Sequence, residues 1–339
     1  MKQIKFIGIC LLFITLSGCF PSNDNVKQEL LLQGKTMGTT YNIKIVVDPN
    51  ATDTENLQQL IDAELKQVNQ EMSTYIPDSE LSLFNSSDSL EPVEMSQGLS
   101  RVIKEAIRLG KLSDGKLDVT VGPLVNLWGF GPEYRPENIP TDETLELARQ
   151  RVGLDKLSLD ENKLTKRNAD LYVDLSTIAK GYGVDIVAEL IESHGIHNYL
   201  VEIGGEMRLK GFKHTGELWH IAIEKPVSEE RAVQQIIVPK DNAVATSGDY
   251  RNYYEVDGQR FSHIIDPSTG KPINHKLVSV TVIHPSSMTA DGLSTAMMVM
   301  GEEKAIAFAH KHDLAAYIIA KSEVGFVEHT SVKFMQYLR

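Results

Sequence analysis

The order of helical and strand patterns along the chain limits its fold more than any other feature. Apolar residues recur at helical spacing early, over 54–73 and 96–112, whereas strand-like segments are concentrated later, mainly between residues 199 and 284. Separate runs of helices and strands are typical of α+β folds and not of a doubly wound parallel sheet. No GxGxxG motif follows a predicted strand, and no GxxxxGK motif ending in Ser or Thr occurs, which disfavours Rossmann and P-loop sites.

We therefore predict an α+β fold with mixed or antiparallel sheets and packed helices. The remaining predicted helices span 178–193, 290–300 and 302–312, and the predicted strands span 40–47, 199–209, 218–224, 235–238, 277–284 and 315–320. The sequence has no internal repeat, and its length is ample for one large domain or two closely packed lobes.

The N-terminus has the pattern of an exported lipoprotein. Lys2 and Lys5 precede an apolar run over 7–16 that is too short to span a bilayer, and Leu16-Ser17-Gly18-Cys19 then resembles the lipobox of bacterial lipoproteins. We predict three segments: a signal peptide over 1–18, a tether acylated at Cys19 over 19–30, and a folded domain over 31–339. Such a protein is lipid-anchored on the periplasmic side of the cell inner membrane. The alternative is an ordinary signal peptide with a chance cysteine.

Composition excludes several kinds of chemistry. Cys10 and Cys19 are the only cysteines of the sequence, so signal removal and acylation leave no free thiol, no disulfide and no cysteine-ligated zinc. The formal net charge is −12, and loss of two lysines with the signal makes it more negative, which argues against a nucleic-acid partner. An acidic protein that binds a diphosphate must neutralise it locally with a metal ion, a helix terminus or a well-placed lysine.

Two short segments, Val173–Tyr182 and Thr289–Ala296, combine carboxylates with hydroxyl side chains. Each places an Asp and small hydroxyl residues at the expected start of an apolar helix, which suits a hard cation and a phosphate at helix N-termini. Asp291, Ser294 and Thr295 are expected on one helical face, where their oxygens can bind Mg²⁺. Taken alone, Asp291 could equally be an acid that stabilises the first helical turn.

The first of these segments also contains a candidate anion site. Asp174 could simply cap the following helix. Lys180, however, is expected in the first helical turn, where its charge opposes the helix dipole unless it meets an anion. The adjacent Gly181 would allow close approach of a ligand or of another backbone segment. Together the three residues favour an anion site over a simple cap.

His263 is the candidate general base. It stands in Ser262–Pro267, just before a turn-forming stretch, and an unperturbed imidazole titrates near neutral pH. A histidine that merely hydrogen-bonds a loop is the equally good alternative at this point. No HExxH motif occurs, which makes a zinc site of that kind unfavourable.

Taken in order along the chain, these residues resemble the ApbE family of FAD:protein FMN transferases. The matching segments are the lipobox, Thr36–Thr39, Ser73–Tyr75, Asp118–Gly131, Asp174–Gly181, Gly204–Glu206, Ser247–Tyr250, Ser262–Pro267 and Ala290–Ala296. The resemblance implies a two-lobed catalytic domain related to the T-fold. It also implies an enzyme that splits FAD at the diphosphate, releases AMP and joins FMN through a phosphoester to a threonine of a partner protein.

The resemblance further implies partners and roles for residues. Acceptors carry an Asp-Gly-x-Ser/Thr-x-Thr motif, as do subunits of the sodium-pumping NADH:quinone reductase and of Rnf complexes. Asp291–Ala296 looks like this motif but has Ala296 in place of the accepting threonine, so we do not expect self-modification. The implied Mg²⁺ neighbourhood is Thr177, Asp291, Ser294 and Thr295. The implied FAD contacts are Met37, Tyr75, Lys116, Leu117, Asp118, Asp174, Lys180 and Ile265.

In this scheme His263 is the base for the acceptor threonine and Asp291 is the second catalytic residue. A threonine hydroxyl is a poor nucleophile that needs a base, and Mg²⁺ bound to the diphosphate stabilises charge on the leaving group. Two alternatives stay open. One is an FAD pyrophosphatase that uses water as the acceptor, and the other is a non-catalytic flavin-binding lipoprotein.

Overall fold

An eight-stranded antiparallel sheet forms the centre of the molecule, with strand order β1-β2-β6-β7-β10-β15-β16-β17. The computed structural model describes residues 27–48, 53–132, 139–226, 232–249, 252–256 and 258–339. The strands of the central sheet are β1 (Gln28–Thr36), β2 (Thr39–Val47), β6 (Tyr199–Ile203), β7 (Glu206–Lys210), β10 (Ala243–Gly248), β15 (Leu277–His284), β16 (Ala315–Ser322) and β17 (Gly325–Thr330).

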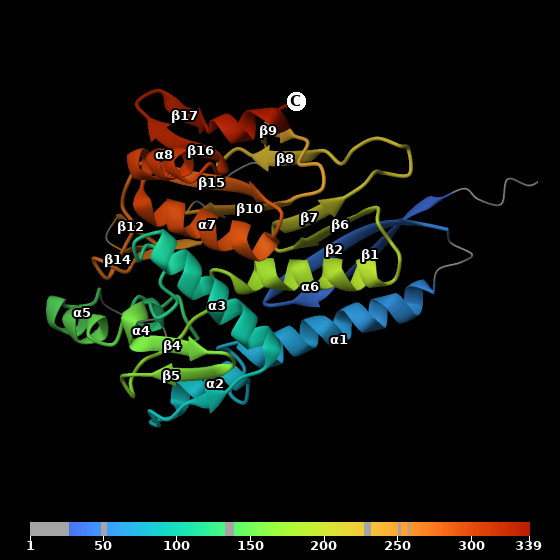
Figure 1. The fold of residues 1–339 in the computed structure, drawn as a ribbon. Coiled ribbons are helices and arrows are strands. Elements are labelled where there is room, and N and C mark those ends of the chain that lie inside the picture. The colour runs from blue at the N-terminus through green and yellow to red at the C-terminus, as the bar shows by residue number, and fades with distance from the viewer. Residues whose placement is uncertain (1–26, 49–52, 133–138, 227–231, 250–251, 257) are drawn as a thin grey trace, which may run out of the picture.

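One face of this sheet is covered by helices (Figure 1). The helices of this layer are α1 (Thr54–Met72), α3 (Gln97–Leu112), α6 (Ala179–Ser193), α7 (Ser287–Met300) and α8 (Glu302–Lys311). Alternate residues of β2, Tyr41, Ile43 and Ile45, are fully buried in the same apolar cluster as Val184 and Val187 of α6. The period of two in the strand thus meets the apolar stripe of the helix, which fixes how α6 lies on the sheet.

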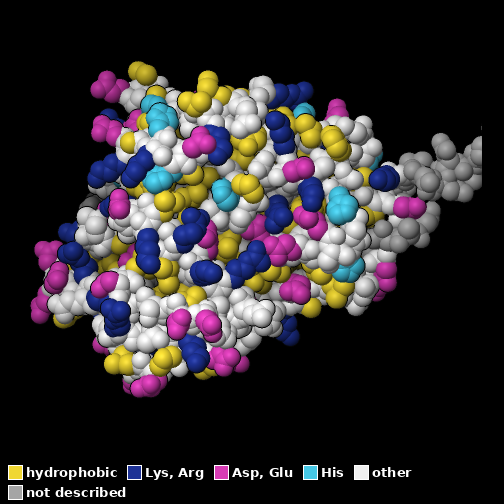
Figure 2. Space-filling model, in the orientation of Figure 1, with side chains coloured by type: hydrophobic (Ala, Val, Ile, Leu, Met, Phe, Trp, Pro, Cys, Tyr) yellow, Lys and Arg dark blue, Asp and Glu magenta, His cyan; other side chains and the backbone are white. Residues whose placement is uncertain are grey.

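The opposite face of the sheet packs against a small hairpin and the C-terminal segment. These are β8 (Ile221–Glu224), β9 (Val233–Ile237) and the 3₁₀ helix η2 (Val332–Tyr337). Trp219 and Phe334 are buried in the apolar cluster on this side. On the face of the molecule seen in Figure 2, side chains of both charge signs are interspersed.

A smaller lobe lies at the lower left of Figure 1, beside the helical layer. Its elements are α2 (Glu80–Ser86), β3 (Val93–Glu94), α4 (Gly122–Leu127), α5 (Asp142–Arg149), the 3₁₀ helix η1 (Leu154–Lys156), β4 (Leu157–Asp160) and β5 (Lys163–Lys166). Two short hairpins complete the chain: β11 (Tyr253–Val256) with β12 (Gln259–Ser262), and β13 (Ile265–Asp266) with β14 (Lys271–Pro272). The α+β class with packed helices, predicted from the sequence, is confirmed, and the central sheet is antiparallel throughout.

Two element predictions were wrong. The strand predicted over 199–209 is the hairpin β6–β7, because Gly204 and Gly205 both have positive φ, 58° and 105°, and form a two-residue turn. The helix predicted from residue 290 begins at Ser287, because the Ser286 side chain accepts from the Thr289 amide and caps it. Asp291 therefore lies in the second turn of α7 and not at the start of the helix.

The N-terminal predictions fall almost entirely outside the described residues. The signal peptide over 1–18, Cys19 and residues 20–26 of the tether belong to that part. The last three residues of the segment 19–30 are the start of β1. Within the described ranges, no helix combines the length and the apolar character needed to cross a bilayer.

Candidate functional site

Two adjoining cavities lie where the hairpin turns at one end of the sheet meet α6 and α7. The first has a volume of about 400 Å³ and the second about 720 Å³. Both are lined by Tyr75, Asp174, Ser176, Lys180 and Asn252, so these residues form the boundary between them. Two adjoining cavities of this kind can accommodate an elongated ligand that extends from one into the other.

Most of the residues predicted from the sequence line the first cavity. They are Tyr75, Lys116, Leu117, Asp118, Asp174, Thr177, Lys180, His263, Ile265, Asp291 and Thr295. Met37 lines the second cavity instead. Ser294 is fully buried and lines neither, because its hydroxyl donates to the Asp291 carbonyl at 2.9 Å and lies 2.8 Å from the Ser247 hydroxyl.

The first hairpin, β1–β2, brings Met37 to the second cavity. Met37 and Gly38 form its two-residue turn, and both have positive φ, 49° and 71°. This conformation matches the twist of the flanking strands, but it is uncommon for a residue with a side chain. The neighbouring turn at Gly204 and Gly205 lies against it, since the Gly204 amide donates to the Thr40 carbonyl at 3.1 Å.

Close packing of α6 on α7 positions the buried carboxylate Asp291. The amide of Gly181 in α6 donates to Asp291 Oδ2 at 3.0 Å. A Cβ at position 181 would lie 2.4 Å from the Ser287 carbonyl oxygen, so only glycine permits this approach. Burial, and then the nearby Glu206 carboxylate, raise the pKa of Asp291 to about 8, against the opposing effect of Lys180.

Lys180 does meet an anion, although the anion is part of the protein. Its ammonium donates to Glu206 Oε1 at 2.6 Å. Burial disfavours the ammonium, but the carboxylates of Glu206 and Asp291 outweigh this and raise the pKa of Lys180. Glu206 itself is 3% exposed, and burial raises the pKa of its carboxyl in spite of the lysine.

Oxygen atoms suited to a hard cation are concentrated beside Asp291. The Ser247 hydroxyl lies 3.0 Å from Thr295 Oγ1, and Thr177 Oγ1 is buried without a hydrogen-bond partner among the described residues. Thr177 and the buried Asp291 carboxylate line the same cavity. An unpaired buried oxygen there fits a cation ligand, because it otherwise costs stability. The described residues contain no group of three or more His, Cys, Asp or Glu side chains able to hold a metal.

The ring of His263 is fixed in one tautomer. Its Nδ1 lies 2.9 Å from the Asn252 carbonyl, which can only accept, so Nδ1 carries the hydrogen and Nε2 keeps the lone pair. The ring also packs edge-on against Phe130, with the ring centroids 6.3 Å apart. Burial lowers the pKa of His263 below its ordinary value of 6.5, which favours the neutral form.

The other polar residues of the first cavity are tied to its walls. The Lys116 ammonium lies 3.0 Å from Asp266 Oδ1 and also 3.0 Å from the Ser268 hydroxyl. Asp118 accepts from the Thr120 hydroxyl at 2.6 Å, and burial raises the pKa of its carboxyl. These contacts hold both side chains at the cavity in defined positions.

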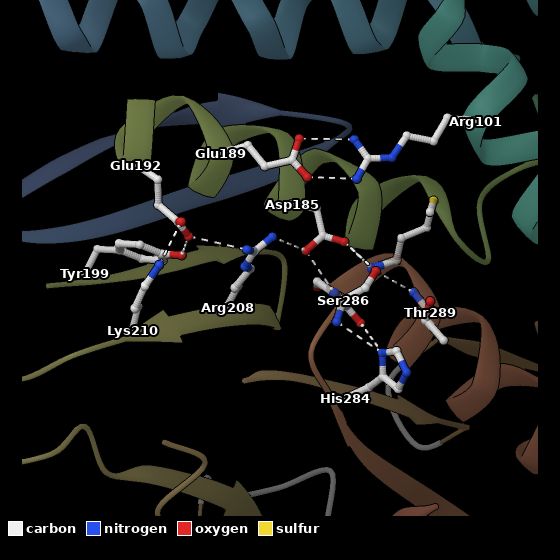
Figure 3. A network of polar contacts seen from close by, with 12 residues as sticks. Arg101, Asp185, Glu189, Glu192, Tyr199, Arg208, Lys210, His284, Ser286 and Thr289 are labelled. Carbon is white, nitrogen blue, oxygen red and sulfur yellow. Dashed lines mark hydrogen bonds and ion pairs between the residues drawn. The ribbon is translucent and has the colours of Figure 1, made fainter. Parts of the chain in front are cut away.

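A polar cluster elsewhere on the α6–α7 contact, the Asp185 cluster, fixes the start of α7 (Figure 3). We define it as Asp185, Arg208, Ser286, Ser287 and Met288. The Asp185 carboxylate accepts from the Ser286 hydroxyl at 2.7 Å and from the amides of Ser287 and Met288 at 3.0 and 3.1 Å. Arg208 of β7 donates to it at 3.1 Å. This anchor lies one helical turn before Asp291 and sets the position of that residue.

Sequence reasoning missed three residues of the site. Glu206 follows a glycine pair and carried no role, although Gly204–Glu206 was one of the matching segments. Ser247 stood in another matching segment, again without a role. Asn252 acts on His263 through its backbone carbonyl, for which a side-chain pattern gives no signal.

Comparisons with known proteins identify the family of this chain. The model of the ApbE family matches residues 37–318, so the chain belongs to the ApbE family. An FAD:protein FMN transferase from Vibrio cholerae is 54% identical over 325 residues, which cover 96% of each chain. One from Haemophilus influenzae is 53% identical, covering 98% of this chain and 97% of its own.

Solved structures resemble the chain equally well. The structure of the flavin transferase ApbE from Vibrio cholerae has a TM-score of 0.87 and 55% sequence identity, and the match covers 92% of this chain and 100% of that one. The family predicted from the sequence motifs is therefore confirmed.

Proposed function

We propose that this protein is an FAD:protein FMN transferase that moves FMN from FAD to a threonine hydroxyl of a partner protein and releases AMP. The names of its relatives support the flavin-transfer chemistry. The observation that carries the proposal is that a histidine held by a backbone carbonyl, a lysine, a buried carboxylate and several hydroxyl groups line one cavity. These are the parts that phosphoryl-type transfer to a weak nucleophile requires.

In the proposed reaction the threonine oxygen of the acceptor attacks the FMN phosphorus of FAD. Nε2 of His263 takes the proton of that hydroxyl, because Nδ1 is already bonded to Asn252. The bond between the phosphorus and the bridging oxygen breaks, and AMP leaves with the electron pair. A phosphoester between FMN and the acceptor remains, so all atoms are accounted for.

The residues proposed to hold Mg²⁺ are Asp291, Thr177, Ser294 and Thr295. The Ser294 hydroxyl is already hydrogen-bonded, so this residue would contribute its backbone carbonyl oxygen. The four residues fit this ion, because Asp291 is a buried carboxylate and the Thr177 hydroxyl has no partner among the described residues. When bound, Mg²⁺ supplies positive charge to the diphosphate and to the developing AMP leaving group. Asp291 also orients this region through its bond to Gly181.

The residues proposed to bind FAD are distributed over both cavities. Tyr75, Asp174 and Lys180 border both spaces, and Met37 lines the second. Lys116, Leu117, Asp118 and Ile265 line the first. An elongated dinucleotide that extends through both spaces would contact all eight of these residues.

The proposed acceptors are exported or membrane-bound redox subunits with an Asp-Gly-x-Ser/Thr-x-Thr motif, such as those of sodium-pumping NADH:quinone reductase or Rnf complexes. Ala296 replaces the accepting threonine in the similar segment of this chain, and Asp291 to Ala296 lie inside a buried helix. We therefore propose modification of a partner and not of the enzyme itself.

We also propose that Cys19 is acylated and anchors the protein to the periplasmic side of the inner membrane. The support is the lipobox-like pattern that ends at Cys19. Cys19→Ser should move the protein from the membrane fraction to the soluble periplasm and leave activity on a soluble acceptor unchanged. Continued membrane attachment of this variant would show that another feature holds it there.

The transfer activity is tested by incubating the protein with FAD and Mg²⁺, with and without a soluble acceptor domain that carries the motif. A transferase releases AMP together with acceptor-bound FMN, and an acceptor whose last motif threonine is changed to alanine stays unmodified. AMP release that does not depend on the acceptor would indicate an FAD pyrophosphatase. FAD binding without AMP under any condition would indicate a non-catalytic flavin-binding protein.

A further inference from the structure

Glu206 is a buried carboxylate in the lining of the first cavity, and the roles proposed above leave it unexplained. It follows the glycine turn at the start of β7 and is 3% exposed. One of its oxygens accepts from the Lys180 ammonium at 2.6 Å. The other, Oε2, is buried and has no hydrogen-bond partner among the described residues. A buried, half-satisfied carboxylate costs stability, so its retention at a cavity needs a reason.

The charges around Glu206 provide the reason. Lys180 is the cation at the first turn of α6, and the carboxyls of Glu206, Asp291 and, most weakly, Glu202 act on it. With Glu206 ionised to pair with the lysine, Lys180, Glu206 and Asp291 sum to zero when Asp291 is protonated and to −1 when it is ionised, and Glu202 adds only negative charge. In neither state is this cluster positive, although it lies where a diphosphate must be neutralised.

The rest of the first cavity does not change this balance. Lys116 is paired with Asp266 at 3.0 Å, so that pair is neutral. Asp118 and Asp174 add only carboxyl groups, and His263 favours the neutral ring. The described part of the cavity therefore offers an anion no net positive charge of its own.

We propose that Glu206 makes binding of the FAD diphosphate depend on a divalent cation, because it cancels the charge of Lys180. Without Glu206, the lysine at the helix N-terminus would attract a diphosphate by itself. With Glu206, the diphosphate is bound well only when it arrives with, or meets, a cation held by Asp291 and its neighbouring oxygens. This inference rests on the proposed use of FAD and Mg²⁺.

The test compares FAD affinity in EDTA and in Mg²⁺, measured by quenching of flavin fluorescence in the absence of acceptor. Glu206→Gln removes one negative charge and keeps the shape of the side chain. A unit charge a few ångströms from the ligand, at an effective dielectric constant of about 20, changes affinity by about tenfold or more. Metal-free binding should therefore tighten by about tenfold, and the gain that Mg²⁺ provides should shrink by a similar factor.

Glu202→Gln is the matched control. Glu202 also ends near this turn, but its carboxylate accepts from Asn42 at 2.6 Å and from the Gly205 amide at 2.7 Å, and no contact with Lys180 is present. It is partly exposed, and its charge is the smallest of the causes that raise the pKa of Lys180. This variant should therefore change the metal dependence much less than Glu206→Gln does. If the role of Glu206 is purely structural, Glu206→Gln will lower the melting temperature without changing the ratio of the FAD affinities in EDTA and in Mg²⁺.

A second variant keeps the test decisive if Glu206→Gln fails to fold with an unpaired lysine. In Lys180→Met no buried ammonium needs a partner, and the buried Glu206 carboxyl, which has lost its cation, takes the neutral form. Because the pair is already neutral in the wild type, metal-free FAD affinity should stay close to that of the wild type, whereas loss of an uncancelled lysine would weaken it by about tenfold. Equal ratios of the two affinities in wild type and Glu206→Gln, or a tenfold loss of metal-free affinity in Lys180→Met, would overturn the inference. If the wild type does not bind FAD even with Mg²⁺, the proposed function itself is wrong.

Discussion

The α6–α7 contact contains two buried carboxylates that lie one helical turn apart and differ in how they are satisfied. Asp185 accepts four hydrogen bonds, from Arg208, Ser286, Ser287 and Met288. Asp291 accepts one, from Gly181, and its neighbourhood contains further oxygens without partners. Both are almost fully buried, so burial alone does not separate structural from functional carboxylates.

The difference between Asp185 and Asp291 shows how the α6–α7 pair can hold one carboxylate rigidly and leave another able to bind a ligand. A buried carboxylate that is fully hydrogen-bonded and ion-paired fixes its surroundings, whereas one with unused oxygens retains the capacity to bind a cation. Burial, and then the Glu206 charge, raise the pKa of Asp291 to about 8. The Asp185 cluster thus positions Asp291, because Ser287 and Met288 begin the helix that carries Asp291.

The largest loss of activity is expected when Asp291 is changed. Asp291→Asn should lower AMP release and FMN transfer by about 10³-fold or more at ordinary Mg²⁺ concentrations, because the site loses its cation-binding charge. The free energy of unfolding should stay the same or rise, because a buried carboxylate next to Glu206 is replaced by a neutral group. Activity is measured by chromatographic detection of AMP, and the free energy of unfolding is measured by urea denaturation. Wild-type turnover by the folded variant would remove the metal assignment.

His263→Ala should slow transfer to threonine by about 10²–10⁴-fold, because a general base is lost. FAD affinity should stay close to normal, and the loss should ease as pH rises if hydroxide substitutes for the base. Flavinylation rate and fluorescence quenching give the two quantities.

The control for His263→Ala is a histidine that contacts the Asp185 cluster. His284 bonds the backbone of Ser286 and does not line either cavity, so His284→Ala should leave the transfer rate much less affected. Should FAD affinity collapse in His263→Ala while the rate at saturating FAD stays normal, His263 binds FAD and the base must be another group, with Asp174 the next candidate.

A change in the Asp185 cluster should affect the free energy of unfolding more than the rate of FMN transfer. Asp185→Asn leaves Arg208 with a weaker partner in a buried network and should lower the free energy of unfolding by about 3 kcal/mol. Glu189→Gln is the control, because its pair with Arg101 has side chains 43% and 45% exposed and should contribute less than about 1 kcal/mol. A drop in FAD affinity by Asp185→Asn as large as that by Asp291→Asn would abolish the distinction between the two carboxylates.

The smallest expected effect concerns the pH dependence of transfer. Burial lowers the pKa of His263, so the neutral ring that can accept a proton persists at pH values below its ordinary 6.5. The acid limb of the transfer rate should therefore fall below pH 6.5 and be absent from His263→Ala. Transfer rates measured between pH 5 and 8, at saturating FAD, test this. An acid limb above 6.5 would contradict the burial of the ring.

Much of the site could be predicted because it depends on local spacing. Asp291 and Thr295 are four residues apart on one helix and both line the first cavity, as the helical period requires. Lys180 lies in the first turn of α6, as its sequence position indicated. The α+β class followed from the order of patterns, because that order is a property of the chain alone. The roles of these residues stay predictions until they are measured.

Other features are absent from any local pattern. Gly181 and Asp291 are 110 positions apart, and their bond exists only because α6 and α7 pack without an intervening side chain. Glu206 meets Lys180 because a glycine turn ends β6 early and begins β7 beside the first turn of α6.

The sequence by itself thus determined which side chains share a helix face, where α6 begins, and which chemical groups were available. The tertiary structure alone decided which of two buried carboxylates is satisfied, which anion Lys180 meets, and which nitrogen of His263 keeps its lone pair. The physical reason is that helical and strand periods are set by neighbouring residues, whereas hydrogen-bond partners between distant segments depend on sheet register and helix packing.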